Sequence, residues 1–80
     1  MVVAEVRIEL KRGIADPEGA NTRKALELLG FKGVAAVSSI KTYVITLDEK
    51  DPKKARANVD EMCRKLLSNP VIHNYKIDII

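Results

Sequence analysis

The chain has 80 residues and one cysteine, Cys63, so neither an intrachain disulfide nor a zinc site built on several cysteines is possible. A domain of this size buries only about 60% of the surface of its unfolded chain, so we expect self-association to add stability. The net charge of +3 comes from 14 basic and 11 acidic residues of interspersed sign. One Phe, two Tyr and no Trp offer little for base stacking, which disfavours a nucleic-acid partner.

No apolar stretch of the sequence is long enough for a membrane span, and Glu5 places a charge within the first five residues. A secretory signal peptide has a different pattern, with a basic start and then an apolar segment. We therefore expect a cytoplasmic protein without a membrane partner.

The first predicted element is a strand over residues 2–11, in which apolar and charged residues alternate. Such alternation is typical of a strand with one buried and one solvated face. The residues expected on the buried face are Val2, Ala4, Val6, Ile8 and Leu10.

A ten-residue connection, Leu10 to Gly19, follows this strand and is longer than the usual 4–6 residues. Asp16 can cap a helix whose first residue is Pro17, while Gly13 and Gly19 permit positive φ angles. The connection is either an ordinary polar loop or a surface that presents four charged residues to a partner. These are Lys11, Arg12, Asp16 and Glu18.

The first predicted helix carries one apolar stripe and ends at a glycine. Thr22, Ala25, Leu26 and Leu29 have the i, i+3, i+4, i+7 spacing of a helix face. Gly30 follows where a left-handed residue ends many helices, and Phe31 is placed to contact Leu26.

Residues 34–47 form a second β region, in either one bent strand or two short strands around Ser38–Ile40. Its outer face, with Val44 between two threonines, carries no charge. That face is either covered by a second copy of the chain or simply solvated.

The second predicted helix begins with Asp51 as the N-cap and Pro52 at the first position. Its apolar stripe contains Ala55, Val59, Met62, Cys63, Leu66 and Leu67. The opposite side is charged, and Asp60 with Arg64 and Glu61 with Lys65 form favourable i, i+4 pairs. Cys63 lies on the apolar stripe, so we interpret it as a buried structural thiol.

Asn69-Pro70 ends this helix, and residues 71–80 form the last predicted strand, which contains the single histidine, His73. A Cys63–His73 catalytic pair is disfavoured because Cys63 lies mid-helix on the core side. No metal-ligand spacing or phosphate-binding loop is present.

The elements predict an α+β fold in the order β-α-β-(β)-α-β, as one domain over residues 1–80. Because each amphipathic helix needs an apolar surface, we expect a two-layer sandwich. In it, both helices lie on one face of a mostly antiparallel sheet.

Several short segments, in order along nearly the whole chain, make the sequence resemble the PurS family. PurS is the small subunit of phosphoribosylformylglycinamidine synthase, an enzyme of purine biosynthesis. The segments are Leu10-Lys11, Asp16-Pro17-Glu18-Gly19, Ala25-Leu26, Leu29-Gly30-Phe31, Lys41, Glu61-Met62-Cys63, Lys65-Leu66-Leu67, Asn69-Pro70-Val71-Ile72 and Tyr75.

The resemblance implies a non-catalytic assembly subunit that forms dimers or larger homo-oligomers, such as tetramers. Its partners would be a glutaminase subunit, which releases ammonia, and a large synthetase subunit, which uses ATP and magnesium to activate an amide oxygen. The chain itself would bind no cofactor or metal.

The regions Lys11–Gly19 and Asn69–Tyr75 hold dense family matches outside the periodic core, so we expect them to dock the partners. The predicted interface residues are Lys11, Asp16, Pro17, Glu18, Gly19, Lys41, Asn69, Pro70 and Tyr75. Two positions depart from the family pattern: Ile40 stands where a glycine is usual, and His73 stands where an acidic residue is usual.

Three alternatives share the element order or the residue types. The first is a ligand-sensing regulatory domain of ACT or ferredoxin-like type, and the second is an RNA-binding module, which would need stacking aromatics on its middle strands. The third is a stand-alone thiol enzyme.

Overall fold

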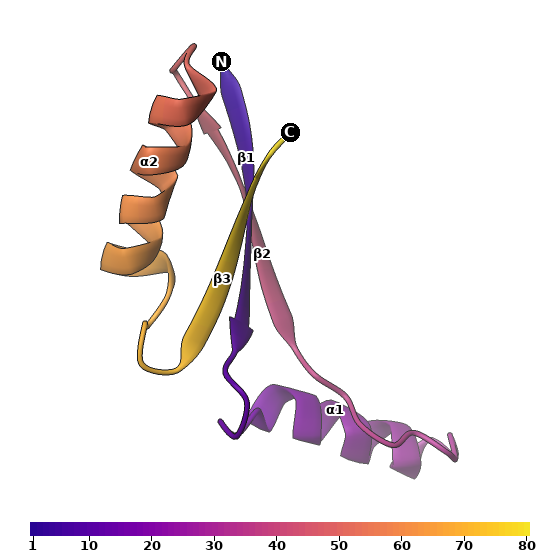
Figure 1. Cartoon of the computed structure of the whole chain (residues 1–80). Coiled ribbons are helices and arrows are strands. Elements are labelled where there is room, and N and C mark those ends of the chain that lie inside the picture. Colours follow the sequence, from indigo (N-terminus) through magenta and orange to yellow (C-terminus); the bar gives the residue numbers. More distant parts are fainter.

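The computed structural model describes all 80 residues as three strands and two helices, one of which ends in a π-helical turn. The elements are β1 (Val2–Leu10), α1 (Pro17–Leu28), β2 (Ile40–Leu47), α2 (Pro52–Met62), the π-turn η1 (Cys63–Leu67) and β3 (His73–Ile79). The strands form one antiparallel sheet in the order β2-β1-β3, with β1 in the centre (Figure 1). The predicted α+β class and antiparallel sheet are confirmed.

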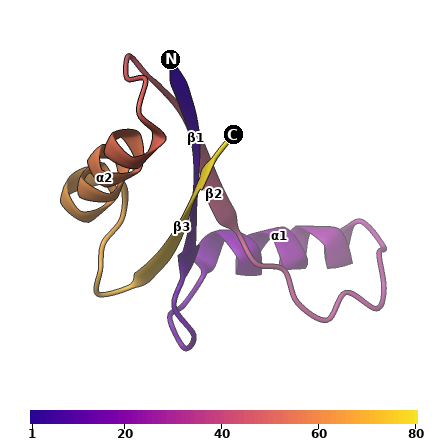
Figure 2. The ribbon, with the colours of Figure 1, turned by 45° about the horizontal axis from the view of Figure 1, so that its top comes forward.

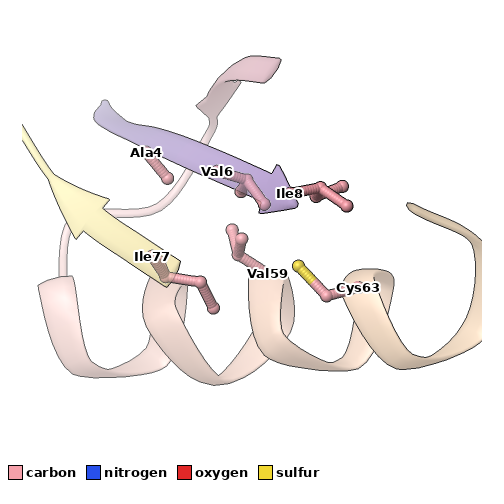
Figure 3. Packing of buried hydrophobic residues seen from close by; sticks show 6 residues of the cluster. All are labelled: Ala4, Val6, Ile8, Val59, Cys63 and Ile77. Atoms are coloured by element: carbon pink, nitrogen blue, oxygen red, sulfur yellow. The ribbon is translucent and has the colours of Figure 1, made fainter. Parts of the chain in front are cut away.

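The core lies between α2 and one face of β1, where the predicted alternation holds. Val6 and Ile8 point toward Val59 and Cys63 of the helical segment, and Ile77 of β3 completes the contact (Figure 3). Val6, Val59 and Cys63 are the largest fully buried side chains. The buried residues of β1 alternate along the strand, and those of the helical segment are four residues apart. Each set therefore lies on one face of its element, and the two faces meet in one small core.

The placement of α1 differs from the prediction that both helices cover the sheet. Of the two helices, α2 is the one that packs extensively against the strands, over β1 and β3. In contrast, α1 projects from the end of the sheet and lies beside the extended residues 31–39 (Figures 1 and 2). The predicted stripe of α1 is exposed except for Leu26, which is half-buried. The physical reason is the Asp16 contact described below, which fixes the start of α1 beside the residues that precede β2.

The second β region is one strand, β2, that begins at Ile40. Residues 34–39 are extended but pair with no strand, and no bulge occurs at Ser38. On β2, Tyr43, Ile45 and Leu47 pack against the core, as predicted. Val44 on the opposite face is 64% exposed.

Both predicted helix starts and the predicted end of α1 are confirmed. Asp16 accepts from the backbone N–H of Gly19 at 2.9 Å, and Asp51 accepts from that of Lys53 at 2.9 Å. At the end of α1, Gly30 has a φ of 94°. The N–H groups of Gly30 and Phe31 donate to carbonyls in the last turn of α1, which is the Schellman arrangement.

The predicted stripe of the second helix is correct at Ala55, Val59 and Cys63 and wrong at Leu66, which is 83% exposed. The helix widens after Met62, where the N–H of Ser68 donates to the carbonyl of Cys63 five residues earlier. Residues in this wider turn rotate by less than in an α-helix, so Leu66 turns away from the sheet while Leu67 stays beside it. Met62 is also partly exposed, at 38%.

The two predicted charge pairs form on the outer side of this segment. Asp60 and Arg64 lie 3.0 Å apart, and Glu61 and Lys65 lie 2.6 Å apart. Both pairs are largely solvent-exposed, so each contributes only a few tenths of a kcal/mol. Neither helix has the length and apolar character needed to cross a membrane.

The difference between the two sheet faces predicts unequal effects of one substitution. Val6→Ala should lower the free energy of unfolding by about 2 kcal/mol, because it removes two buried methyl groups and leaves a cavity. Val44→Ala should change it by less than about 0.5 kcal/mol, because Val44 is exposed. Urea unfolding at equal protein concentration measures both, and equal losses would contradict the one-sided core.

Candidate interaction site

The candidate site is a groove at the end of the sheet where β1 ends and where β2 and β3 begin. It has a volume of about 670 Å³ and an apolar floor that includes Ile8, Leu10 and Leu67. The polar part of its wall comes from three separate stretches of the chain. Those residues are Asp16, Glu18, Ser39, Lys41, Thr42 and His73.

Asp16 connects the start of α1 to the residue before β2. Its carboxylate accepts the backbone N–H of Ser39 at 2.7 Å and the Ser39 hydroxyl at 2.8 Å, in addition to the N–H of Gly19. These hydrogen bonds favour the ionised carboxylate, and the bond from Gly19 is the largest of the causes that lower the pKa of Asp16. One side chain thus fixes two segments that are 23 residues apart in the sequence.

Gly19 is required for a reason other than the positive φ that the sequence suggested. It is helical and buried, and a Cβ added to it would lie 2.3 Å from the carbonyl oxygen of Val37. Glycine therefore allows residues 31–39 to approach the first turn of α1. Gly13 does have a positive φ, 85°, as expected.

Lys11 joins the two regions that were expected to dock partners. Its ammonium group donates to the carbonyl of Pro70 at 2.7 Å, and its backbone N–H donates to the carbonyl of Ile72 at 2.8 Å. The Lys11–Gly19 connection and the turn before β3 consequently lie side by side at one end of the molecule.

Asn69 organises that turn with both its backbone and its side chain. Its side-chain oxygen accepts the N–H of Val71 at 3.0 Å, and its carbonyl accepts those of Ile72 and His73. The N–H of Asn69 in turn donates to Nδ1 of His73 at 2.9 Å. His73 therefore supports the turn while lining the groove.

The remaining predicted interface residues lie in different places. Pro17, Glu18 and Lys41 line the groove, and the Lys41 ammonium lies 5.9 Å from the centre of the Tyr43 ring. Tyr75 instead packs against the core, and its hydroxyl donates to Asp60 at 2.6 Å. This hydrogen bond raises the pKa of Tyr75.

Comparison with known proteins places this geometry in a family. A model of the PurS family, described as phosphoribosylformylglycinamidine (FGAM) synthase, matches residues 3–80. The chain belongs to the PurS family. It is thus a subunit of that synthase, an enzyme of purine biosynthesis, and the ligand-sensing alternative is not favoured.

Relatives and solved structures agree with the family model. PurS of Archaeoglobus fulgidus is 51% identical over 76 residues, covering 95% of each chain. The crystal structure of Methanocaldococcus jannaschii PurS superposes with a TM-score of 0.88 at 44% identity, covering 100% of this chain and 96% of that one. The fold also matches a chain in the structure of PurLQS from Thermotoga maritima, with a TM-score of 0.73, 20% identity, and 99% and 96% coverage.

Cys63 of this PurS chain is the buried thiol that the helical stripe predicted. Burial, with a smaller contribution from Asp60, raises the pKa of the Cys63 thiol, which disfavours the nucleophilic thiolate. Its neighbours are the apolar residues of the core, whereas His73 is engaged in the Asn69 turn.

The most important residue that sequence reasoning missed is Ser39. Nothing in its local sequence indicates that it would meet Asp16, because the contact spans 23 residues and depends on the direction of α1. The tandem serines before β2 are the only local signal, and by themselves they indicate a bulge or a hairpin bend and not a long-range contact.

The Asp16 contact predicts an acid-sensitive connection between α1 and β2. Because the folded-state pKa is lowered, the stabilisation is complete above the unfolded-state pKa and is lost as pH falls below about 4, through the folded-state value. NMR should show the Gly19 and Ser39 amide shifts titrating together below that pH, and Asp16→Asn should abolish the transition. Independent titrations of the two amides would contradict a shared carboxylate.

Proposed function

We propose that the chain is a non-catalytic assembly subunit that couples a glutaminase subunit to the ATP-dependent synthetase subunit of the synthase. The observation that carries the proposal is the Lys11–Pro70 hydrogen bond, which joins the two expected docking regions into one surface. A fixed surface built from two loops can orient two larger subunits without supplying a reacting group.

The chemistry belongs to the partners in this proposal. The glutaminase subunit releases ammonia, and the synthetase subunit uses ATP and magnesium to activate the amide oxygen of formylglycinamide ribonucleotide, which ammonia then displaces. The name PurLQS of the Thermotoga maritima structure supports PurL and PurQ as the two partners. All these steps would take place in the cytoplasm.

We also propose that the chain self-associates as a dimer or a larger oligomer. Its radius of gyration is 16.1 Å, whereas a compact chain of 80 residues has about 12 Å. Leu28, Leu29 and Phe31 are exposed together at the end of α1. A projecting helix with an apolar, solvent-exposed end is typical of an interface.

An omission experiment tests the coupling role. The large and glutaminase subunits are assayed with and without this chain, with glutamine or free ammonia as the nitrogen source. Glutamine-dependent turnover should require the chain, while ammonia-dependent turnover should largely persist, because ammonia bypasses the coupling. If omission changes neither activity, the assembly role is wrong.

Substitutions at the groove end of the sheet test the docking surface. Lys11→Ala and Asp16→Ala should each weaken assembly of the complex at least about tenfold, because each loosens one of the two loops. Lys50→Ala and Asp48→Ala are matched controls at the opposite end of the sheet, between β2 and α2. Sedimentation of the mixed subunits measures assembly, and equal behaviour of both pairs would contradict docking at the groove.

A further inference from the structure

His73 closes the turn before β3 with both its backbone and its ring. Its backbone N–H donates to the carbonyl of Asn69 at 2.8 Å, and its Nδ1 accepts the backbone N–H of Asn69 at 2.9 Å. Since a backbone N–H can only donate, Nδ1 carries no proton in this arrangement. The neutral ring therefore holds its proton on Nε2.

Protonation of the ring would remove this closure. Both nitrogens of an imidazolium are donors, so Nδ1–H and the N–H of Asn69 would face each other as two donors. The other hydrogen bonds of the turn run from the N–H groups of Val71, Ile72 and His73 to oxygens of Asn69, and none of them supplies a new acceptor. The ring must then rotate away or the turn must open.

The ring is the group at this end of the sheet whose charge changes near neutral pH. Carboxylates and ammonium groups ordinarily keep their charge between about pH 5 and 8, whereas an imidazole does not. The hydrogen bonds from Gly19 and Ser39 lower the pKa of Asp16 further. Leu10, opposite His73 on β1, and Leu67 in the groove add no charge. The charged and titratable groups around the ring are Asp16 and Glu18 from the start of α1, Lys41 from β2, Lys11 after β1, and Tyr75 on β3 itself.

The turn is also one half of the surface proposed for docking. The Lys11 ammonium donates to the carbonyl of Pro70, and the Lys11 backbone N–H donates to that of Ile72. Both acceptors lie within the turn that His73 closes. Opening the turn would move both of them, and so would loosen the contact with the Lys11–Gly19 connection.

We propose that His73 makes the docking surface sensitive to pH: its neutral ring closes the Asn69–His73 turn, and its protonation opens the turn. Only the neutral ring can accept the N–H of Asn69, so the closed turn is favoured above the pH range in which histidine takes up a proton. It is lost as pH falls through that range. The effect on assembly rests on the proposed docking role, whereas the effect on the turn does not.

NMR of the full chain tests the turn. As pH falls from about 8 to about 5, the Asn69 amide shift should follow the ring protons of His73 with one shared midpoint. His73→Asn is the matched variant, because its Oδ1 can stand where Nδ1 was and does not titrate, and it should keep the Asn69 amide constant. In His73→Gln the amide lies farther from the backbone, so the Asn69 amide should match the low-pH form throughout. A parent Asn69 amide that stays constant while the ring titrates would overturn the proposal.

Sedimentation of the mixed subunits tests the consequence for docking. The parent chain and His73→Asn are compared at about pH 7.5 and about pH 5.5, so titrating groups of the partners act on both chains alike. The parent should bind about fivefold more weakly than His73→Asn at the lower pH, because one hydrogen bond is lost, and within about twofold of it at the higher pH. Equal binding at both values would overturn the link between His73 and docking. Failure of both chains to bind either subunit at any pH would overturn the proposed function and this link with it, while the NMR titration decides the turn separately.

Discussion

The Asp16 carboxylate sets the direction of α1 and of the residues that lead into β2. It accepts three hydrogen bonds, two of them from Ser39, and so holds the first turn of α1 against the chain just before β2. With that contact in place, α1 and the extended residues 31–39 run side by side, away from the sheet (Figure 1). Asp16 and Ser39 both line the groove at the end of the sheet, so this contact also shapes the candidate site.

The consequence is a domain with a small core and large exposed apolar areas. The buried cluster comes from β1, α2, η1 and β3, whereas Tyr43, Ile45 and Leu47 of β2 are only partly buried against it and α1 contributes no residue. An 80-residue domain has little stability to spare in any case. The incomplete cover of β2 and the exposed end of α1 are therefore two aspects of one constraint, the outward direction of the helix.

Local patterns predicted the elements well, whereas long-range contacts decided their placement. The alternation along β1, the caps at Asp16 and Asp51 and the buried Cys63 all follow from residues within one or two turns of each other. The packing of α1 does not, because it depends on Ser39 and on the close approach of Val37 to Gly19. The two expected docking regions follow from the resemblance to the family, and their proximity depends on the hydrogen bond between Lys11 and Pro70, 59 residues apart, which no periodicity encodes.

A subunit that works only within a complex can obtain part of its stability from its partners. Any partner that binds only the folded chain stabilises it, by about 2.7 kcal/mol when its concentration is 100 times the dissociation constant. In this chain, one end of the sheet carries the Asp16–Ser39 hydrogen bonds, the Lys11–Pro70 hydrogen bond and the start of α1. If the partners dock there as proposed, their contacts would act on α1, residues 31–39 and the groove together, and assembly would stabilise the fold as well as join the subunits. The folded, correctly oriented form would then be most populated where both larger subunits are present, which is where coupled release and use of ammonia are needed.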